Sequence, residues 1–437
     1  MRKEQARQEK VQLLTPVETI SVEGFKSIRD KAVLAVPPLA LLAGANSSGK
    51  SSAMQPLLLL KQTLEVPYDP GPLCLDGPNA RFTRSEQILW NGPGGRGNGK
   101  FSIEMESGIF KFHLCFRSEA GKGMAVEEIR YWDSEWRRIR PQMAQSELIA
   151  AMSWPHENTM RKMKEMGPDT EWMLIWHRFL FMFANKRTGT VFGPPAQITV
   201  FEKQLRHLIH LPALRGNPER AYRRSGLGFG FPGLFQDYVA SLLHQWKEER
   251  NPKIDQVSQS LARLGLTWKV DIKPIDDISV ELQVGRLCRA NRKTRDAMVS
   301  IADVGFGISQ VLPVLVALIA AERGQLVYIE QPEIHLHPKA LNAMAALLGD
   351  AAKRGVRLVV ETHSALVLLG IQTLVAKGEL DPSLVKLHWF ERDKDGATQV
   401  HSGDLDKQGR FGDWPQDFGH VELAAENEYL DASLFRR

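Results

Sequence analysis

Apolar residues either alternate with polar ones or run together, in segments that predict strands and helices. Residues 17–25 alternate and residues 32–43 form a nearly continuous apolar run, so each is predicted to be a strand of one sheet. A glycine-containing segment follows at residues 44–51, and a helical pattern then extends to Leu64. Strand, glycine loop and helix in this order form the context in which a phosphate loop occurs.

The middle of the chain changes character twice. Residues 67–99 are rich in proline and glycine and are predicted to be mostly loop. Residues 101–117 alternate, which favours an antiparallel hairpin. Residues 126–206 hold half of the tryptophans and mix a strand pair with helices. We interpret this last segment as an inserted lid or arm.

The second half returns to long apolar segments. A helix is predicted at about residues 231–250, followed by a strand-rich piece to residue 287 and apolar strands at 326–330 and 356–360. The predicted units are a leader (1–16), an N-terminal lobe (17–125), the insertion (126–206), a C-terminal lobe (207–370) and a C-terminal extension (371–437).

Composition adds only broad limits. The 437 residues are 43% hydrophobic and 24% charged, which is typical of a soluble folded protein. The formal net charge of +5 permits a nucleic-acid partner through a local patch, such as the basic stretch 136–140, without requiring one. The charged N-terminus and the lack of a long apolar run favour a cytoplasmic location without export signal or membrane span.

Three cysteines occur, and their spacing fits neither a zinc site nor a disulfide framework. We interpret Cys74, Cys115 and Cys288 as ordinary buried thiols.

Residues 44–51 match the phosphate-loop pattern G-x-x-x-x-G-K-[S/T] at every fixed position. The glycines let backbone N–H groups face the phosphates, Lys50 would neutralise their β and γ oxygens, and Ser51 would ligate Mg²⁺. The competing interpretation is a glycine turn that only caps a helix. The predicted ATP-binding residues of this loop are Gly44, Asn46, Ser47, Ser48, Gly49, Lys50, Ser51 and Ser52.

Acidic residues follow the two apolar strands of the C-terminal lobe. Glu330 ends the first strand and is predicted to serve Mg²⁺, although a solvated strand end is the simpler alternative. The segment Glu361-Thr-His363 ends the second strand and brings a histidine to the same edge of the sheet. A metal pair at His335 and His337 is a weaker alternative, because no further ligand has recognisable spacing. His207 and His210 are expected on one side of a helix.

Together these motifs resemble the ABC ATPase superfamily, in the branch that contains the OLD, RecF and SMC proteins. The chain looks most like the stand-alone ATPases of bacterial anti-phage systems, such as the Septu-type ATPase subunit. The resemblance covers about residues 17–89 and 205–369. It implies an α/β phosphate-loop core, an antiparallel β subdomain and a mainly helical insertion.

The resemblance also implies site residues. Residues 304–310 look like a signature loop, in which Gly307, Ser309 and Gln310 bind the ATP of a second protomer and Ser309 opens a helix. Residues 335–338 fall at the D-loop and His363 at the switch histidine. Gln87 falls near a Q-loop glutamine that ligates metal, although an ordinary exposed glutamine is a competing interpretation. Residues 212–220 also look like a segment of these defence ATPases, in which an arginine, Arg215 or Arg220, could reach phosphate; a surface turn is the competing interpretation.

One residue departs from the family pattern. The catalytic glutamate beside the Walker B acid Glu330 is here Gln331, and an amide cannot accept a proton from the attacking water. Either Glu333 or His363 then takes that role, or hydrolysis is slow.

We therefore expect an ATP- and Mg²⁺-dependent homodimer that regulates a separate nuclease or other effector in anti-phage defence. OLD-type nucleases carry a TOPRIM domain after the ATPase, but the residues after His363 are expected to leave no room for one, and a hairpin turn is predicted at 393–396. The alternatives are a DNA-repair clamp of the RecF or SMC kind and a non-hydrolysing ATP-dependent scaffold.

Overall fold

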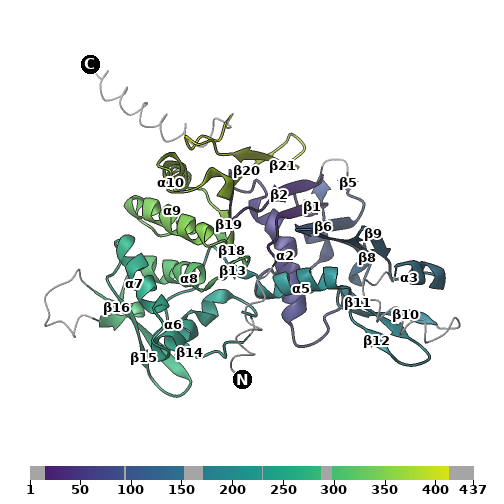
Figure 1. The fold of residues 1–437 in the computed structure, drawn as a ribbon, viewed down its shortest axis with the longest axis horizontal. Coiled ribbons are helices and arrows are strands. Elements are labelled where there is room, and N and C mark those ends of the chain that lie inside the picture. The colour runs from purple at the N-terminus through teal and green to yellow at the C-terminus, as the bar shows by residue number, and fades with distance from the viewer. Residues whose placement is uncertain (1–14, 93–94, 152–170, 229, 287–297, 413–437) are drawn as a thin grey trace.

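Two six-stranded sheets, three smaller sheets and the helices around them make up the described part of the protein (Figure 1). A mostly parallel sheet lies among the helices of the C-terminal half, and an antiparallel sheet lies beside it, on the other side of helix α2 (Lys50–Glu65). The computed structural model describes residues 15–92, 95–151, 171–228, 230–286 and 298–412.

The mostly parallel sheet has the strand order β13-β18-β19-β3-β20-β21. Every neighbouring pair is parallel except β20 and β21. The carboxyl ends of its parallel strands therefore meet at one edge, where α/β proteins bind ligands. The strands are β13 (Ile209–Leu211), β18 (Leu326–Glu330), β19 (Arg357–Glu361), β3 (Leu39–Gly44), β20 (Val385–Arg392) and β21 (Thr398–Asp404).

Both faces of this sheet are buried, which explains why its strands are almost continuously apolar. Leu41 and Val360 point into a core shared with five helices, whereas Leu42 and Val359 point into a core shared with α2 and the antiparallel sheet. The five helices are α6 (Val239–Glu248), α7 (Lys253–Arg263), α8 (Phe306–Ala320), α9 (Pro338–Lys353) and α10 (Ala365–Ala376). This arrangement confirms the predicted α/β core.

The antiparallel sheet confirms the predicted β subdomain and corrects one strand. The hairpin expected at residues 101–117 is present, with its turn at Gly108. The run 32–43 is two strands in different sheets, because Pro37 and Pro38 interrupt it and cannot donate to a ladder. The strand order is β2 (Ala32–Ala35), β1 (Thr19–Glu23), β6 (Lys100–Ser107), β7 (Phe110–Glu119), β8 (Gly123–Asp133) and β9 (Glu135–Ile139).

The insertion is less helical than expected within its described residues. A three-stranded sheet, β10 to β12, follows the helix α3 (Gln145–Ala151), and α5 (Ala196–His207) closes the segment. The aromatic strands β10 and β11 alternate and pair through a tight turn at Arg178, so they favour a hairpin over a helix. The strands are β10 (Trp172–His177), β11 (Leu180–Asn185) and β12 (Val191–Phe192).

Between the insertion and α8, the sequence-based prediction missed a helix. The helix expected at 231–250 is the short η2 (Phe235–Tyr238) followed by α6, and α7 lies where strand was expected. Buried Val257, Leu261 and Leu264, with half-buried Ile254, recur at helical spacing along α7 and its C-terminal cap, so the sequence carried a helical signal that the prediction missed. The strands after α7 are β15 (Val270–Pro274), β16 (Ser279–Gly285) and β17 (Met298–Ser300), joined by β14 (Tyr222–Arg223).

The cysteines and the helix lengths bear on two expectations from the sequence. Cys74 is buried and Cys115 half-buried, both are free thiols, and burial raises the pKa of Cys115 to about 11. Cys288 lies outside the described residues. No helix of the described part is long and apolar enough to cross a membrane.

Candidate nucleotide site

The loop between β3 and α2 needs both of its fixed glycines. Gly44 has φ 138° and Gly49 has φ 110°, conformations that other residues rarely adopt. A Cβ atom on Gly44 would lie 2.2 Å from the carbonyl oxygen of Phe390, and one on Gly49 would lie 2.2 Å from Oγ1 of Thr398. The phosphate-loop pattern therefore corresponds to real steric limits at this position.

Lys50 lies at the centre of the loop and is only 3% exposed. Its Nζ donates to the carbonyl oxygens of Gly44 (3.0 Å) and Ala45 (2.7 Å). Burial lowers the pKa of Lys50, and the carboxylates of Glu361 and Glu333 partly oppose that effect. The loop lines a cavity of about 290 Å³ whose walls are Lys26, Ser27, Ser47, Ser48, Gly49, Lys50, Ser51, Ser52, Gln55, Glu361, His363 and Arg392.

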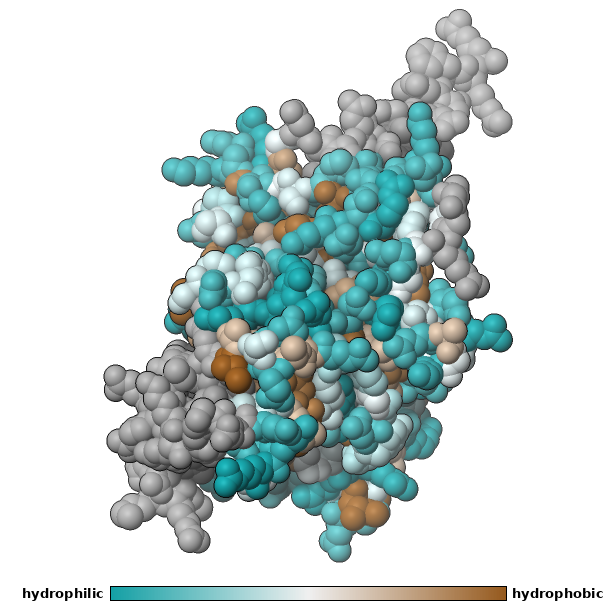
Figure 2. Space-filling view, turned by 90° about the vertical axis from the view of Figure 1, so that its right-hand side faces the viewer, coloured by the Kyte–Doolittle hydropathy of each residue, from teal (hydrophilic) through white to brown (hydrophobic). Residues whose placement is uncertain are grey.

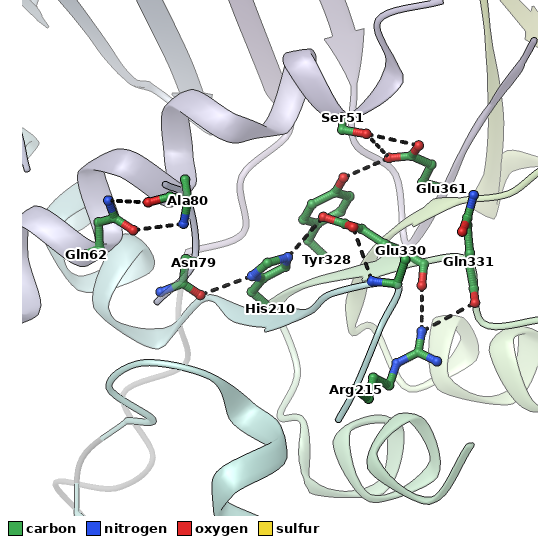
Figure 3. Close-up of polar contacts among 11 residues, drawn as sticks. Ser51, Gln62, Asn79, Ala80, His210, Arg215, Tyr328, Glu330, Gln331 and Glu361 are labelled. Carbon is green, nitrogen blue, oxygen red and sulfur yellow. Dashed lines mark hydrogen bonds and ion pairs between the residues drawn. The ribbon is translucent and has the colours of Figure 1, made fainter. Parts of the chain in front are cut away.

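The carboxylate that contacts Ser51 is Glu361 (Figure 3). The Ser51 hydroxyl lies 3.1 and 2.9 Å from the two oxygens of Glu361, and the Tyr328 hydroxyl donates to the second of them at 2.9 Å. From the sequence, Glu361 was noted only as the neighbour of His363. A signal existed, because Glu361 is a charged residue at the end of an apolar strand and pairs in register with Glu330.

Glu330 lies at the end of β18 and faces a histidine (Figure 3). His210 Nε2 lies 3.1 Å from one carboxylate oxygen of Glu330, and the backbone N–H of Ala213 donates to the other at 3.2 Å. His210 Nδ1 lies 3.0 Å from the side chain of Asn79. The expectation that His207 and His210 share a helix is wrong, because α5 ends at His207 and His210 belongs to β13.

The two neighbouring carboxylates have pKa shifts of opposite direction. Burial and the repulsion of Glu330 raise the pKa of Glu361, against the hydrogen bonds from Ser51 and Tyr328. Burial also acts to raise the pKa of Glu330, but the contacts with His210 and Ala213 outweigh it and the net shift is downward. Adjacent titratable groups with divergent pKa values are a feature of functional sites.

Gln331, Glu333 and His363 lie around the same sheet edge. Gln331 has φ 44°, and its N–H donates to the carbonyl oxygen of Glu361 at 2.8 Å. Glu333 Oε1 accepts from the Thr362 hydroxyl (2.7 Å) and from the His363 N–H (2.8 Å), while its buried Oε2 has no partner among the described residues. His363 lines the cavity, and burial and the charge of Lys50 lower its pKa.

The matched family supports a nucleotide-binding domain here. Residues 200–369 match the family described as "AAA domain, putative AbiEii toxin, Type IV TA system". The matched residues include Glu330, Glu361 and His363. The phosphate loop, residues 44–51, lies outside the matched range but contacts Glu361 and lines the same cavity as His363. No curated protein matches the chain.

Solved structures with a similar arrangement are heads of SMC proteins. An SMC head bound to the C-winged helix domain of ScpA is 15% identical, with a TM-score of 0.45, covering 90% of this chain and 98% of that one. The SMC head of Thermotoga maritima is 10% identical, with a TM-score of 0.39 and coverage of 88% and 98%. A head with an extended coiled coil, bound to a ScpA domain from Pyrococcus furiosus, is 13% identical, with a TM-score of 0.45 and coverage of 94% and 99%.

Arg215 contacts the backbone at the end of β18 (Figure 3) and also contacts Gln310 of α8. Arg215 is only 5% exposed, whereas Arg220 in the same predicted segment is exposed and pairs with Asp303. The Arg215 guanidinium donates to the carbonyl oxygens of Glu330 (2.5 Å) and Gln310 (3.1 Å), and its backbone N–H donates to the Gln310 side chain at 3.1 Å. Burial lowers the pKa of Arg215 to about 10, so it stays charged near neutral pH.

The signature-like loop is only partly as expected. Helix α8 begins at Phe306, so Ser309 lies within its first turn, and its hydroxyl donates to the carbonyl oxygen of Phe306 at 2.9 Å. Gln310 is 4% exposed and donates to the carbonyl oxygen of Gly216, so its side chain is engaged inside the domain and cannot face a second protomer. Gly307 packs against the carbonyl of His335, which a Cβ atom would approach to 3.1 Å.

Gln87 does not reach the Ser51 site. Its side-chain oxygen accepts from the N–H groups of Thr83 (2.8 Å) and Arg84 (3.2 Å), which closes its own short turn. The metal role predicted for Gln87 is therefore wrong. Gln55 on α2 lines the cavity instead.

The pair His335 and His337 does not form a metal site in the described structure. His337 caps α9 by accepting from the N–H of Lys339 at 3.2 Å, and the ring of His335 lies beside that of Phe306. Among the described residues, no group of three or more His, Cys, Asp or Glu side chains could hold a metal ion.

The basic stretch on β9 is neutralised by acidic neighbours. Arg137 pairs with Glu135, Arg138 with Glu128 and Arg140 with Glu147, at 2.7 to 2.9 Å. The side of the molecule next to this sheet is mainly hydrophilic, with small separate hydrophobic areas (Figure 2). Nothing in these ion pairs favours the stretch as a nucleic-acid patch.

Proposed function

We propose that the protein is an ABC-type ATPase subunit that binds Mg-ATP between two copies of itself and controls a separate nuclease or effector in anti-phage defence. One observation carries the proposal: the phosphate loop after β3, Glu330 at the end of β18, and Glu361 and His363 at the end of β19 meet at one sheet edge. The family match to an AAA domain whose description names the AbiEii toxin supports both the nucleotide and the defence role.

The loop would hold the phosphates. Lys50 is buried and its charge is held by two backbone carbonyls, which phosphate oxygens would replace. Ser48 Oγ and the N-terminal N–H groups of α2 offer further donors. His363, at the same cavity wall, is placed to contact the terminal phosphate.

The oxygen donors at Ser51 fit a magnesium ion. The Ser51 hydroxyl and the Glu361 carboxylate lie 2.9 Å apart, with Glu330 at the end of the next strand, and Mg²⁺ prefers hard oxygen ligands. Ser51, Glu361 and Glu330 would hold the ion, which when bound neutralises charge on the phosphates.

Glu333 is the residue best placed to act as the general base in place of Gln331. Its Oε1 is fixed by Thr362 and His363, which leaves Oε2 as the oxygen that could accept a proton from water. Because Gln331 replaces the usual catalytic glutamate, ATP hydrolysis through Glu333 is expected to be slow. Slow hydrolysis suits a switch in which the dimer stays closed around ATP.

Dimer formation is supported by the exposed start of α8. Phe306 is 52% exposed and Gly307 lies next to the His335 segment, so a second protomer could present its nucleotide to the first turn of this helix. The role of Ser309 in that contact belongs to this proposal.

A non-hydrolysing scaffold is the second candidate, and Gln331 is the observation that favours it. Phosphate release by wild type, Lys50→Ala and Glu333→Gln proteins separates the two. The proposal expects slow turnover that Lys50→Ala abolishes and Glu333→Gln lowers at least tenfold. The exposed control Glu379→Gln should match wild type. Wild-type turnover equal to the Lys50→Ala background would contradict the ATPase and favour the scaffold.

A further inference from the structure

The C-terminal hairpin of β20 and β21 packs directly on the phosphate loop. Strand β20 runs parallel to β3 as far as the pair Phe390 and Gly44. The Thr398 hydroxyl lies 2.8 Å from both the Ser48 carbonyl oxygen and the Ser27 hydroxyl. These contacts make the hairpin, which lies beyond the matched residues 200–369, a wall of the cavity.

Arg392, the last residue of β20, reaches the loop itself. Its Nε donates to the carbonyl oxygen of Ser47 at 2.9 Å, and another guanidinium nitrogen donates to the carbonyl oxygen of Gly396. Arg392 remains exposed on the cavity side and forms no ion pair with a carboxylate among the described residues. The acids of the adjacent turn, Asp393 and Asp395, pair with Arg29.

Lys26 is the second cation of this wall. Its Nζ donates to Gln55 Oε1 at 3.1 Å and lies 5.3 Å from the centre of the Phe82 ring, again without a carboxylate partner in the described structure. Burial lowers the pKa of Lys26, and repulsion by Arg392 lowers it further. Lys26 and Arg392 line one cavity and repel each other, and an anion bound between them would offset that repulsion.

The charges of the cavity form two groups. Lys50 Nζ donates to the carbonyl oxygens of Gly44 and Ala45, whereas Arg392 donates to that of Ser47 and Lys26 lies on the Gln55 side. Lys26 also bonds Gln55, five residues beyond Lys50 and therefore about 7 Å further along α2. The cavity thus has a second positive group at a distance from the Lys50 end.

We propose that Lys26 and Arg392 bind phosphate groups other than the terminal one, so that they hold nucleoside diphosphates and triphosphates alike. This inference rests on the proposed function, because it concerns the same cavity. Lys50 and His363 would account for the terminal phosphate. Arg392 then makes the C-terminal hairpin part of the nucleotide site, since a bound phosphate would join it to Lys26 and the loop.

The test compares ADP and a non-hydrolysable ATP analogue by titration calorimetry with the full chain. Arg392→Gln and Lys26→Gln should each weaken both nucleotides about tenfold and by equal factors, because a charge-assisted contact of this kind contributes in both complexes. Lys394→Gln is the matched control, since Lys394 lies exposed on the same turn, and it should bind within twofold of wild type.

Arg392→Lys separates phosphate contact from a purely structural role. It keeps the charge and loses the planar fork that reaches Ser47, so it should recover most of the affinity. Three results would overturn the inference. Arg392→Gln could bind nucleotide as tightly as Lys394→Gln, or it could lose affinity for the triphosphate alone. Arg392→Lys could also bind nucleotide as weakly as Arg392→Gln. Failure of wild type to bind either nucleotide would instead overturn the proposed function.

Discussion

Gly49 shows at single-residue level how the phosphate loop depends on its surroundings. It combines φ 110° with a predicted Cβ contact of 2.2 Å to Thr398. Gly49→Ala should lower the free energy of unfolding by about 3 kcal/mol, from backbone strain and steric overlap. The control Gly378→Ala has φ 72° and open space, so it should cost only about 1 kcal/mol. Equal losses in urea titrations would mean that Thr398 does not crowd the loop.

Arg215 gives a second prediction for a single residue. Arg215→Met removes a buried guanidinium and leaves the carbonyl oxygens of Glu330 and Gln310 without that donor. The free energy of unfolding should fall by about 3 kcal/mol. Arg220→Met breaks an exposed ion pair with Asp303 and should change stability by less than about 1 kcal/mol. If chemical denaturation shows no difference between the two variants, Arg215 does not brace the strand end.

Local patterns predicted some site residues and could not reveal others. Lys50 and Ser51 follow from a contiguous motif, and Glu330 follows from an acid after an apolar strand. Arg392 contributes only because β20 lies next to β3, a strand order that no local pattern encodes, whereas Glu361 carried the same local signal as Glu330 and was missed. Gln310 was predicted to face the ATP of a second protomer, but its side chain donates to the carbonyl oxygen of Gly216 inside the same chain. A sequence motif gives the position of a residue on a helix and does not reveal such a contact.

At the level of the strand, His388 links β20 to two neighbours and makes stability depend on pH. It is fully buried, with Nδ1 2.8 Å from Ser402 Oγ and Nε2 2.8 Å from the carbonyl oxygen of Ala35. Burial lowers its pKa to about 4. Between pH 6.5 and 4, His388 binds a proton in the unfolded chain but stays neutral in the folded chain. The free energy of unfolding therefore falls as the pH falls.

The expected loss from His388 is about 3 kcal/mol between pH 6.5 and pH 4. Urea titrations across this range should show a smaller pH dependence for His388→Gln than for wild type. The control His401→Gln lies exposed on β21 and should keep the wild-type dependence. An unchanged slope in His388→Gln would show that His388 titrates normally.

Element boundaries failed where short-range chemistry overrode the apolar pattern. The run 32–43 became two strands at Pro37, and the helical spacing of Ile254, Val257 and Leu261 in α7 was missed. The hairpin turn predicted at 393–396 is confirmed, because Asp393 caps it through its own side chain. Turn chemistry was therefore predicted correctly, whereas the boundaries of strands and helices were not.

For the whole molecule, the proposal predicts dimerisation that depends on ATP. A non-hydrolysable ATP analogue with Mg²⁺ should shift the protein from monomer to dimer in sedimentation velocity. Ser309→Arg, which places a bulky cation at the first turn of α8, should prevent the shift, whereas Ala376→Arg on the exposed end of α10 should not. A dimer of Ser309→Arg as stable as wild type would exclude α8 from the interface.

Binding of a fluorescent ATP analogue to wild type and Lys50→Ala tests the central claim most directly, with thermal unfolding measured on both to show that each is folded. Lys50 lines the cavity and donates to the loop carbonyl oxygens of Gly44 and Ala45. The account predicts saturable binding by wild type and at least about a hundredfold weaker binding by folded Lys50→Ala, as loss of a buried charge–phosphate contact implies. Equal affinity of the two proteins, or no binding by folded wild type, would contradict it.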